Sequence, residues 1–509
     1  MTTISGQADG VELSRTVNAT GDFRGLASSR PLQLLTLAAL LAAAIWRSML
    51  LKYCVVDLDI WWHLKVGDWI IQHHAVPHNG IFSSTAANRP WIAYSWGYEV
   101  LLSRAYNWFG LVGIGLFGVI LTVAVAYTVF WMVRRLSGSF WAACLLGFIT
   151  CSAFLFTLMP RPVFFSMVLF MVTLTLILEA QRQGNVRKLY WLPLIFVLWA
   201  NLHIQFIYGL FLVGLLLGVN LLLRIAASFG VEPGWLSTSA LPAKQLTVIF
   251  AACMLAGCIG PYSYHLYPVV YEYSKAQVPY FMIRELQPIT FRFACHYVQL
   301  LLTAAGFFVV GRQKKIDPFK LALLTIASVV AYRTMRDSWF ICVPAAACIA
   351  DFLRRECRSD RGERWFENLG LLAGVAFLAF LFARNTNFNT PSLDAAISSQ
   401  FPVSACNFLR KNPTPGPLYN AFDWGGFLIW YMPNYPVAID GRNDLYGDEI
   451  DLRFFKTGSA DVSYATDPYL TEAGTVLLQK TTPLASVLRS DPRFRGIYED
   501  DLAIVFVRQ

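Results

Sequence analysis

The strongest constraint on this chain is a succession of apolar runs, each about as long as a membrane is thick. A helix needs about 20 apolar residues to cross a hydrocarbon layer of roughly 30 Å. Of the 509 residues, 56% are hydrophobic and only 14% are charged, against the roughly 25% charged residues of soluble domains. In lipid, such runs must satisfy their backbone hydrogen bonds internally, as helices do. The sequence therefore predicts a mostly α-helical, polytopic membrane protein.

The apolar runs give about 11 candidate crossings. As one helix, the stretch from 189 to 223 would measure about 52 Å at about 1.5 Å per residue. We expect it to turn back at its polar residues Asn201, His203 and Gln205 as a hairpin with little loop. The candidate crossings lie near 31–51, 110–133, 140–158, 163–180, 189–201, 205–223, 245–261, 296–311, 319–332, 338–353 and 368–384.

Groups of Lys and Arg between the apolar runs predict the orientation. If 189–223 crosses twice, the basic groups near 134–135, 182–188, 224–244, 312–320 and 354–364 all share one side. By the positive-inside rule that side is cytoplasmic. The net charge of +9 is accounted for by these groups and predicts no nucleic-acid partner. We therefore expect a cytoplasmic tail (1–30), a transmembrane domain (31–384) and an extracytoplasmic domain (385–509).

The last 125 residues have ordinary polarity. Short apolar runs at 437–439, 475–478 and 504–507 alternate with helical pieces at 403–411 and 484–489, a pattern typical of a small soluble α/β domain. The dense polar segments at 423–426 and 440–444 match turn sequences. A turn role is favoured there over a glycan contact, in which Trp424 would stack on a sugar.

The first outer loop, 52–109, holds two carboxylates in VVDLDIWWHLKVGDW. Helical spacing from Trp62 to His73 predicts an amphipathic helix whose Trp residues rest at the membrane interface. Asp59 is the better placed of the two acids to cap this helix. Asp57 is then left at the mouth of the bundle, and an ionisable group there indicates function. We expect Asp57 or Asp59 to be catalytic, with a preference for Asp57.

Other polar residues converge on the same predicted outer side, where all seven histidines fall. Asn201, His203 and Gln205 either hydrogen-bond between helices or line a pocket, and the sequence leaves both open. Outward-facing arginines suit a lipid-linked phosphate because a guanidinium binds phosphate through two bonds. The alternatives are headgroup contacts or a local pair of Arg336 with Asp337. The candidates are Arg161, Arg284, Arg333 and Arg336.

Several motifs of soluble and nucleotide-driven chemistry are missing from the sequence. It has no GxxxxGK[ST], no HExxH, no GxSxG and no GxGxxG placed after a strand. Nucleotide-driven transport and the familiar hydrolase classes are therefore unsupported.

The chain resembles the GT-C superfamily of membrane glycosyltransferases. The segments DLDIWWHLKVGDWI, PHNGIFSST and RPWIAYSWGYEVLL, then MPRPVFFS, WANLHIQFIYG, YNAFDWGGFLIW and AIDGRNDLYG, are similar to those of a group of bacterial GT-C-like proteins. The resemblance covers most of the chain. It implies a multi-pass protein of the bacterial inner membrane that acts on the cell envelope.

The resemblance also implies a reaction. A sugar would pass from a polyprenyl-phosphate donor, among membrane lipids, to a glycan, lipid or protein acceptor on the extracytoplasmic face. An Asp of the first outer loop would be the general base, and His63 would hold a carboxylate or contact the phosphate. Asp59 and His63 could instead share a divalent metal ion, and the sequence leaves metal dependence open.

Two other functions remain open on the sequence alone. A lipid or glycan transporter would be expected to show inverted repeats with paired broken helices, whereas here only the break at 201–205 stands out. A non-catalytic protein of envelope polysaccharide assembly would not depend on Asp57 or Asp59. The crowding of polar residues on one face favours the enzyme.

Overall fold

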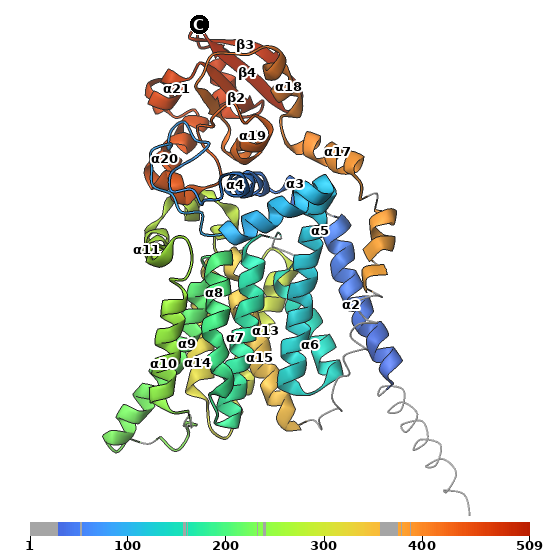
Figure 1. Cartoon of the computed structure of the whole chain (residues 1–509), viewed down its shortest axis with the longest axis vertical. Helices are drawn as coiled ribbons and strands as arrows, with labels where there is room; N and C mark the ends of the chain where they lie inside the picture. Colours follow the sequence, from blue (N-terminus) through green and yellow to red (C-terminus); the bar gives the residue numbers. More distant parts are fainter. Residues whose placement is uncertain are drawn as a thin grey trace, which may run out of the picture.

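The computed structural model describes residues 29–50, 53–155, 159, 161–231, 233–237, 241–356, 375–377, 379–386 and 388–509. The tail predicted at 1–30 lies almost wholly outside these residues, and the crossing predicted at 368–384 lies outside them in part. The chain forms a helical bundle with a smaller, sheet-containing part at one end (Figure 1). The predicted fold class is confirmed.

The bundle contains helices long and apolar enough to cross a membrane. By length and composition, the described residues offer five: Arg30–Val56, Trp96–Ser137, Val163–Gln183, Phe206–Ser228 and Ala294–Gly311. Shorter apolar helices span Phe140–Phe154, Ala243–Ala256 and Val375–Asn385, and the count of about 11 crossings stays a prediction. The bundle helices are α2 (Arg30–Leu50), α5 (Trp96–Ser137), α6 (Phe140–Phe154), α7 (Val163–Gln183), α8 (Leu192–Leu202), α9 (Phe206–Ser228), α10 (Ala243–Ala256), α13 (Ala294–Gly311), α14 (Pro318–Arg333) and α15 (Trp339–Glu356).

Two breaks in these helices position the site. Helix α8 ends at Leu202, His203 is extended (φ −164°, ψ 142°), and α9 begins at Phe206, which confirms the predicted turn. Helix α5 is divided at Gly110 (φ 60°, ψ −145°), a conformation that glycine adopts readily. The part of α5 before Gly110 packs on α4 (Ile60–His73), where the Ser103 hydroxyl donates to Asp68 at 2.5 Å.

The C-terminal part is built on a four-stranded sheet of order β1-β2-β4-β3. Strand β1 (Leu418–Asn420) runs parallel to β2 (Thr475–Gln479), whereas β4 (Ala503–Arg508) is antiparallel to β2 and to β3 (Phe494–Glu499). The predicted run at 437–439 is not a strand of this sheet, because Val437 instead forms a bridge with Ser83 of the first loop. The surrounding helices include α17 (Thr390–Gln400), α18 (Val403–Lys411), α19 (Gly425–Tyr431), α20 (Asn443–Gly458), α21 (Pro468–Glu472) and α22 (Pro483–Leu488).

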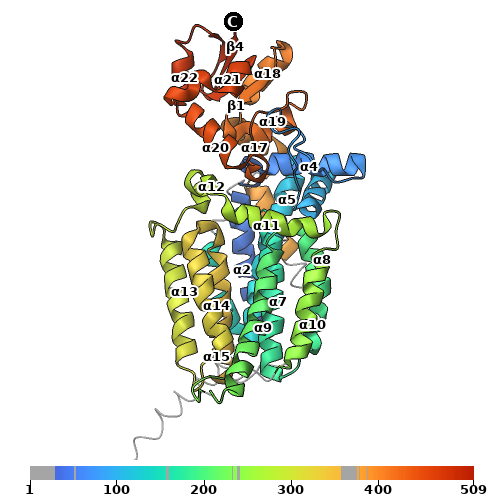
Figure 2. The same cartoon turned by 90° about the vertical axis from the view of Figure 1, so that its left-hand side faces the viewer.

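Helix α4 lies between the bundle and the C-terminal part (Figures 1 and 2). The predicted helix is confirmed, but Trp62, one of the Trp residues expected at the membrane interface, packs inside the protein. Trp61 and Trp62 are buried, and the Trp61 ring lies 4.4 Å from that of Trp430 and 5.7 Å from that of Phe427. Burying these aromatic surfaces holds the C-terminal part against the first outer loop.

Candidate active site

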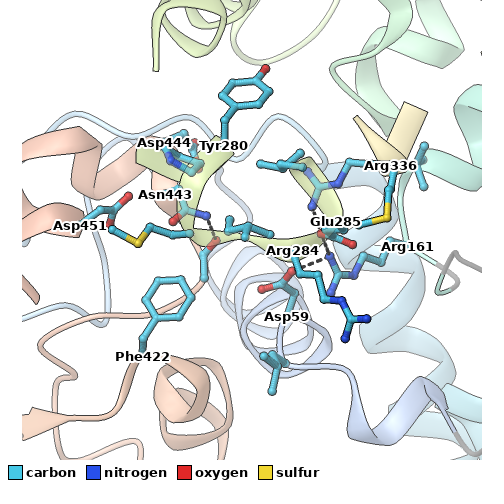
Figure 3. Close-up of a pocket in the computed structure, with 18 of the residues that line it drawn as sticks. Asp59, Arg161, Tyr280, Arg284, Glu285, Arg336, Phe422, Asn443, Asp444 and Asp451 are labelled. Atoms are coloured by element: carbon cyan, nitrogen blue, oxygen red, sulfur yellow. Dashed lines mark hydrogen bonds and ion pairs between the residues drawn. The ribbon is translucent and has the colours of Figure 1, made fainter. Parts of the chain in front are cut away.

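A cavity of about 1430 Å³ lies where the bundle, the first outer loop and the C-terminal part meet. Its walls include Asp59 at the start of α4, Arg161 before α7, and Glu285 and Arg336 from two loops between bundle helices. In Figure 3 these four side chains converge on one side of the cavity. A cleft of this kind with converging polar groups is the usual form of a ligand site.

Arg161 is the centre of a charged network on this side. Its Nε donates to Asp57 Oδ2 at 2.7 Å, and its Nη1 lies 3.1 Å from Asp59 Oδ2 and 2.8 Å from Glu285 Oε1. Arg336 also pairs with Glu285. The network thus joins three carboxylates to two guanidinium groups, and mutual charge compensation holds all five side chains in place.

The two acids of the DLD segment have different surroundings. Asp57 is 3% exposed, accepts from the Asp59 backbone N–H at 2.8 Å, and does not line the cavity. Asp59 stands at the N-cap position of α4 but its side chain makes no capping bond. It accepts from the Trp62 indole at 3.2 Å instead and faces the cavity. The reason for preferring Asp57, that Asp59 caps the helix, is therefore wrong, because Asp59 faces the cavity instead; which of the two acids is the base stays a prediction.

Burial and neighbouring charges give the carboxyl groups of Asp59 and Glu285 different pKa values. Burial raises the pKa of Asp59 to about 6, and the negative charges of Asp57 and Glu285 add to this, although Arg161 opposes it. Burial would also raise the pKa of Glu285, but Arg161 and Arg336 outweigh it and hold the pKa at about 2. Glu285 is therefore a permanent anion that positions the arginines, whereas Asp59 can take up a proton near neutral pH.

Asp59 and His63, the pair that could share a metal ion on the sequence alone, are directed to separate partners. Asp59 faces Arg161, and His63 Nδ1 lies 3.1 Å from Glu99 Oε1 inside the protein. Burial, followed by the charge of Arg161, lowers the pKa of His63 well below its ordinary value. Among the described residues, no group of three or more His, Cys, Asp and Glu side chains is arranged to hold an ion. These residues do not fit a metal shared by Asp59 and His63.

The polar residues of the α8–α9 turn divide between two roles. Asn201 lies outside the cavity: its amide donates to the Val197 and Ile259 carbonyls at 2.8 and 2.7 Å and accepts from Trp96 at 3.0 Å. These contacts fix the turn, and the predicted substrate-binding role of Asn201 has no support from the cavity lining. His203 and Gln205 do line the cavity.

Those two cavity-lining residues connect the turn to neighbouring elements. His203 Nδ1 lies 2.8 Å from the Ser166 hydroxyl. Gln205 donates to Asp337 at 3.3 Å, and Asp337 also accepts from the hydroxyls of Thr334 and Tyr208. Arg336 is directed to Glu285, so the local pair of Arg336 with Asp337 is not formed.

The two remaining predicted arginines, Arg284 and Arg333, differ in their position relative to the cavity. Arg284 lines the cavity and is exposed. No hydrogen bond or ion pair joins its side chain to another residue in the described part of the chain. Arg333 lies outside the cavity, with its guanidinium 5.3 Å from the centre of the Tyr280 ring. Its predicted binding role therefore has no support from the cavity lining.

The C-terminal part supplies a second wall that the sequence did not assign to the site. Asp423, Asn443, Asp444 and Asp451 line the cavity there. Trp424 is buried and its indole donates to the Gln400 carbonyl at 3.2 Å, so it cannot stack on a sugar. Glu285 and Asp451 were missed because neither lies in a recognisable motif. The only signal for Glu285 was its position next to Arg284.

No protein-family model and no curated protein sequence matches this chain. Among solved structures, the Archaeoglobus fulgidus oligosaccharyltransferase in its apo form is similar with a TM-score of 0.51 at 11% identity, over 88% of this chain and 69% of that chain. ArnT from Cupriavidus metallidurans bound to undecaprenyl phosphate gives a TM-score of 0.47 at 12% identity, over 92% of this chain and 97% of that chain. ArnT in the apo state gives 0.45 at 13% identity, over 94% and 98%. The likeness to the oligosaccharyltransferase shows that this chain has the GT-C fold, as the sequence resemblance implied.

Proposed function

We propose that this protein is a membrane glycosyltransferase that moves a sugar from a polyprenyl-phosphate donor to an acceptor on the extracytoplasmic face. The observation that carries the proposal is the placing of one accessible carboxylate, Asp59, beside arginines in a large and mostly apolar cavity. The GT-C fold supports it, since the fold is shared with an oligosaccharyltransferase. Fold alone would not define the chemistry.

In this proposal Arg284 binds the donor phosphate first. It is the cavity-lining arginine without a carboxylate partner among the described residues, and a guanidinium matches the geometry of phosphate oxygens. Arg161 and Arg336, held by Glu285, supply further positive charge. Apolar cavity residues such as Ile207, Val270 and Ile283 would receive the lipid next to its phosphate.

The reaction is a single displacement at the sugar C1. An acceptor hydroxyl oxygen attacks C1 as its proton passes to the Asp59 carboxylate. The bond from C1 to the phosphate oxygen breaks, and its electron pair stays on that oxygen as polyprenyl phosphate leaves. The arginines stabilise the charge that develops on the leaving phosphate. A pKa of about 6 suits Asp59 to act as a base near neutral pH.

The orientation of the protein in the membrane is part of the proposal. The bundle ends away from the C-terminal part carry basic residues that meet there: Arg354 donates to the Arg135 carbonyl at 3.2 Å, and Arg182 pairs with Asp351 at 3.1 Å. A basic end faces the cytoplasm by the positive-inside rule. The cavity and residues 385–509 then face the outside of a bacterial inner membrane.

The test uses a strain that lacks the gene and an inventory of the envelope glycans that the deletion removes. Asp59→Asn keeps the size of the side chain and removes the base, so we expect transfer to fall by about 100-fold or more. Asp461→Asn, an exposed acid outside the cavity, should restore the wild-type glycans at equal membrane level. Full glycans with Asp59→Asn and with the Asp57→Asn/Asp59→Asn double variant would contradict the proposal and favour a non-catalytic assembly protein.

A further inference from the structure

The two walls of the cavity differ in the charged groups that they contribute. The wall formed by the bundle loops contributes Arg161, Arg284 and Arg336 together with Glu285 and Asp337. The wall formed by the C-terminal part from residue 418 onward contributes Asp423, Asp444 and Asp451, and no Lys, Arg or His among its described lining residues. In Figure 3, Asp444 and Asp451 lie on the side of the cavity away from Arg161 and Arg336.

Asp451 is the residue of this wall whose burial the other described residues do not explain. It projects from α20 and is 8% exposed, yet it lines the cavity. Neither of its carboxylate oxygens has a hydrogen-bond partner in the described part of the chain. A buried polar group without a partner costs free energy and calls for a specific reason. A ligand that donates to these oxygens from the cavity supplies that reason.

The charges around Asp451 indicate what kind of donor this is. Burial, followed by the negative charges of Asp448, Asp440 and Asp444, raises the pKa of Asp451 to about 8, and Arg89 opposes this shift. The empty cavity therefore favours the protonated acid, and a bound cation would favour the carboxylate. Arg442 is fully buried and committed to Asp440 at 2.7 Å. A neutral hydroxyl would leave this negative potential uncompensated, whereas an ammonium group brings a positive charge and three donors. A divalent ion lacks a set of three ligands among the described residues.

We propose that the C-terminal wall of the cavity is an acceptor subsite for a molecule that carries a primary ammonium group, with Asp451 as its main partner and Asp444 beside it. This inference rests on the proposed transfer reaction, because it takes the arginine wall as the place of the donor phosphate. A donor held there by its phosphate leaves the opposite wall to the acceptor. Asp59 lies on the arginine side, where the acceptor must reach the sugar (Figure 3).

The test compares two probes of equal size on the full-length protein in lipid nanodiscs. One is 2-aminoethyl β-glucoside, which is cationic at pH 7, and the other is its neutral 2-hydroxyethyl counterpart. Dissociation constants are measured by saturation-transfer NMR. We expect the wild-type protein to bind the amine at least about tenfold more tightly. Asp451→Asn should reduce this preference to below about twofold, and the control Asp461→Asn should keep it.

Other arms of the experiment separate the alternatives. If Asp451→Asn does not reach the membrane, Asp444→Asn weakens the same wall and should reduce the preference by about threefold. The preference should persist when undecaprenyl phosphate saturates the protein. Equal binding of both probes, or a preference unchanged in both Asp variants, would overturn the inference. Displacement of the amine by undecaprenyl phosphate would overturn its assignment to the acceptor.

The donor arm also reports separately on the proposed function. If undecaprenyl phosphate fails to bind while the amine preference survives, the polyprenyl-phosphate donor is contradicted and the ammonium subsite is not. If undecaprenyl phosphate binds and the two probes do not differ, the ammonium subsite is contradicted and the donor is not.

Discussion

The two walls of the cavity hold their charged groups in different ways. On the bundle side, Arg161 contacts three carboxylates within 3.1 Å, so that the acids and the guanidinium compensate one another. On the C-terminal side, Asp444 accepts from the Trp91 indole at 3.0 Å, whereas Asp451 has no hydrogen-bond partner among the described residues. Apart from Arg284, the arginines of the first wall are paired with carboxylates, whereas the second wall leaves Asp451 without a partner among the described residues.

This difference shows how a site can combine rigidity with recognition. A compensated network keeps reacting groups in position before the substrate arrives, which is the requirement for stabilising developing charge. An uncompensated acid raises the energy of the empty site and so favours any ligand that supplies the missing charge. The following predictions test this contrast, from the largest expected effect to the smallest.

Removing Arg161 should have the largest effect, because it leaves three carboxylates of the bundle wall without their common partner. We expect Arg161→Gln to lower the free energy of unfolding by about 3 kcal/mol and to abolish transfer. The measurement is thermal unfolding of the purified protein. The double variant Arg161→Gln/Glu285→Gln should recover part of the stability, since one of the uncompensated charges is gone. Equal melting of Arg161→Gln and wild type would show that the wall is not held by compensation.

A methyl group added at Gly441, in the C-terminal wall, should displace the side chain of Asp59, the proposed base. A Cβ atom there would lie 2.1 Å from Asp59 Oδ1, so the carboxylate must move. We expect Gly441→Ala to reduce the transfer rate by about 10- to 100-fold, since small displacements of reacting groups cost that much, with unchanged binding of undecaprenyl phosphate. Gly458→Ala is the matched control because nothing lies within 4 Å of its Cβ position. Equal rates in both variants would count against Asp59 as the base.

The bundle wall should also govern the pH dependence of transfer. The pKa of Asp59 is raised to about 6, and a base must be ionised to accept a proton. The rate should therefore be constant above about pH 7 and fall about tenfold per unit below pH 6. Lipid binding measured at each pH separates this effect from titration of the donor phosphate. A rate that does not change between pH 5 and pH 7 would exclude Asp59 as the titrating group.

Substitutions of Arg284 and Arg333 should give the smallest effects, and these should differ in the KM for the lipid donor. Arg284 lines the cavity, whereas Arg333 packs beside Tyr280 outside it. We expect Arg284→Gln to raise the KM for the lipid donor by about 5- to 10-fold, which corresponds to about 1 kcal/mol, the typical net value of one hydrogen bond, with little change in kcat. Arg333→Gln should stay within about twofold of wild type. Equal changes in KM would mean that the phosphate binds elsewhere.

Much of the fold could be predicted from the sequence because lipid imposes a simple rule on it. The predicted apolar runs are helical over most of their described residues, the polar break at 203–205 forms a turn, and strands form at Thr475–Gln479 and Ala503–Arg508. Helix α4 was located correctly, but the burial of Trp62 against protein was not predicted. The spacing of its Trp residues fits a helix on a membrane surface and a helix buried in protein equally well. Only the tertiary contacts distinguish these two arrangements.

The site was predicted in part because its residues come from distant segments. Asp59, His63 and Arg161 were chosen from the sequence, yet Arg161 meets Asp57 across 104 positions and Glu285 across 124, and no spacing rule covers such distances. The choice between Asp57 and Asp59 depended on which side chain faces the cavity. Asn201 and Gln205 look alike in sequence, but they point to different sides of one turn.

The close contact between the first outer loop and the C-terminal part also limits how such a protein can evolve. Residues 82–85 hydrogen-bond with the chain at 437–438, and a Cβ atom at Gly426 would lie 2.5 Å from the Leu58 carbonyl oxygen. Because these backbones touch directly, a side chain at position 426 would push residues 385–509 away from the DLD segment, so the two segments must keep matching shapes. Recombination between relatives should therefore have transferred the two segments together, and chimaeras that join them from different sources should lose activity even when both parts fold.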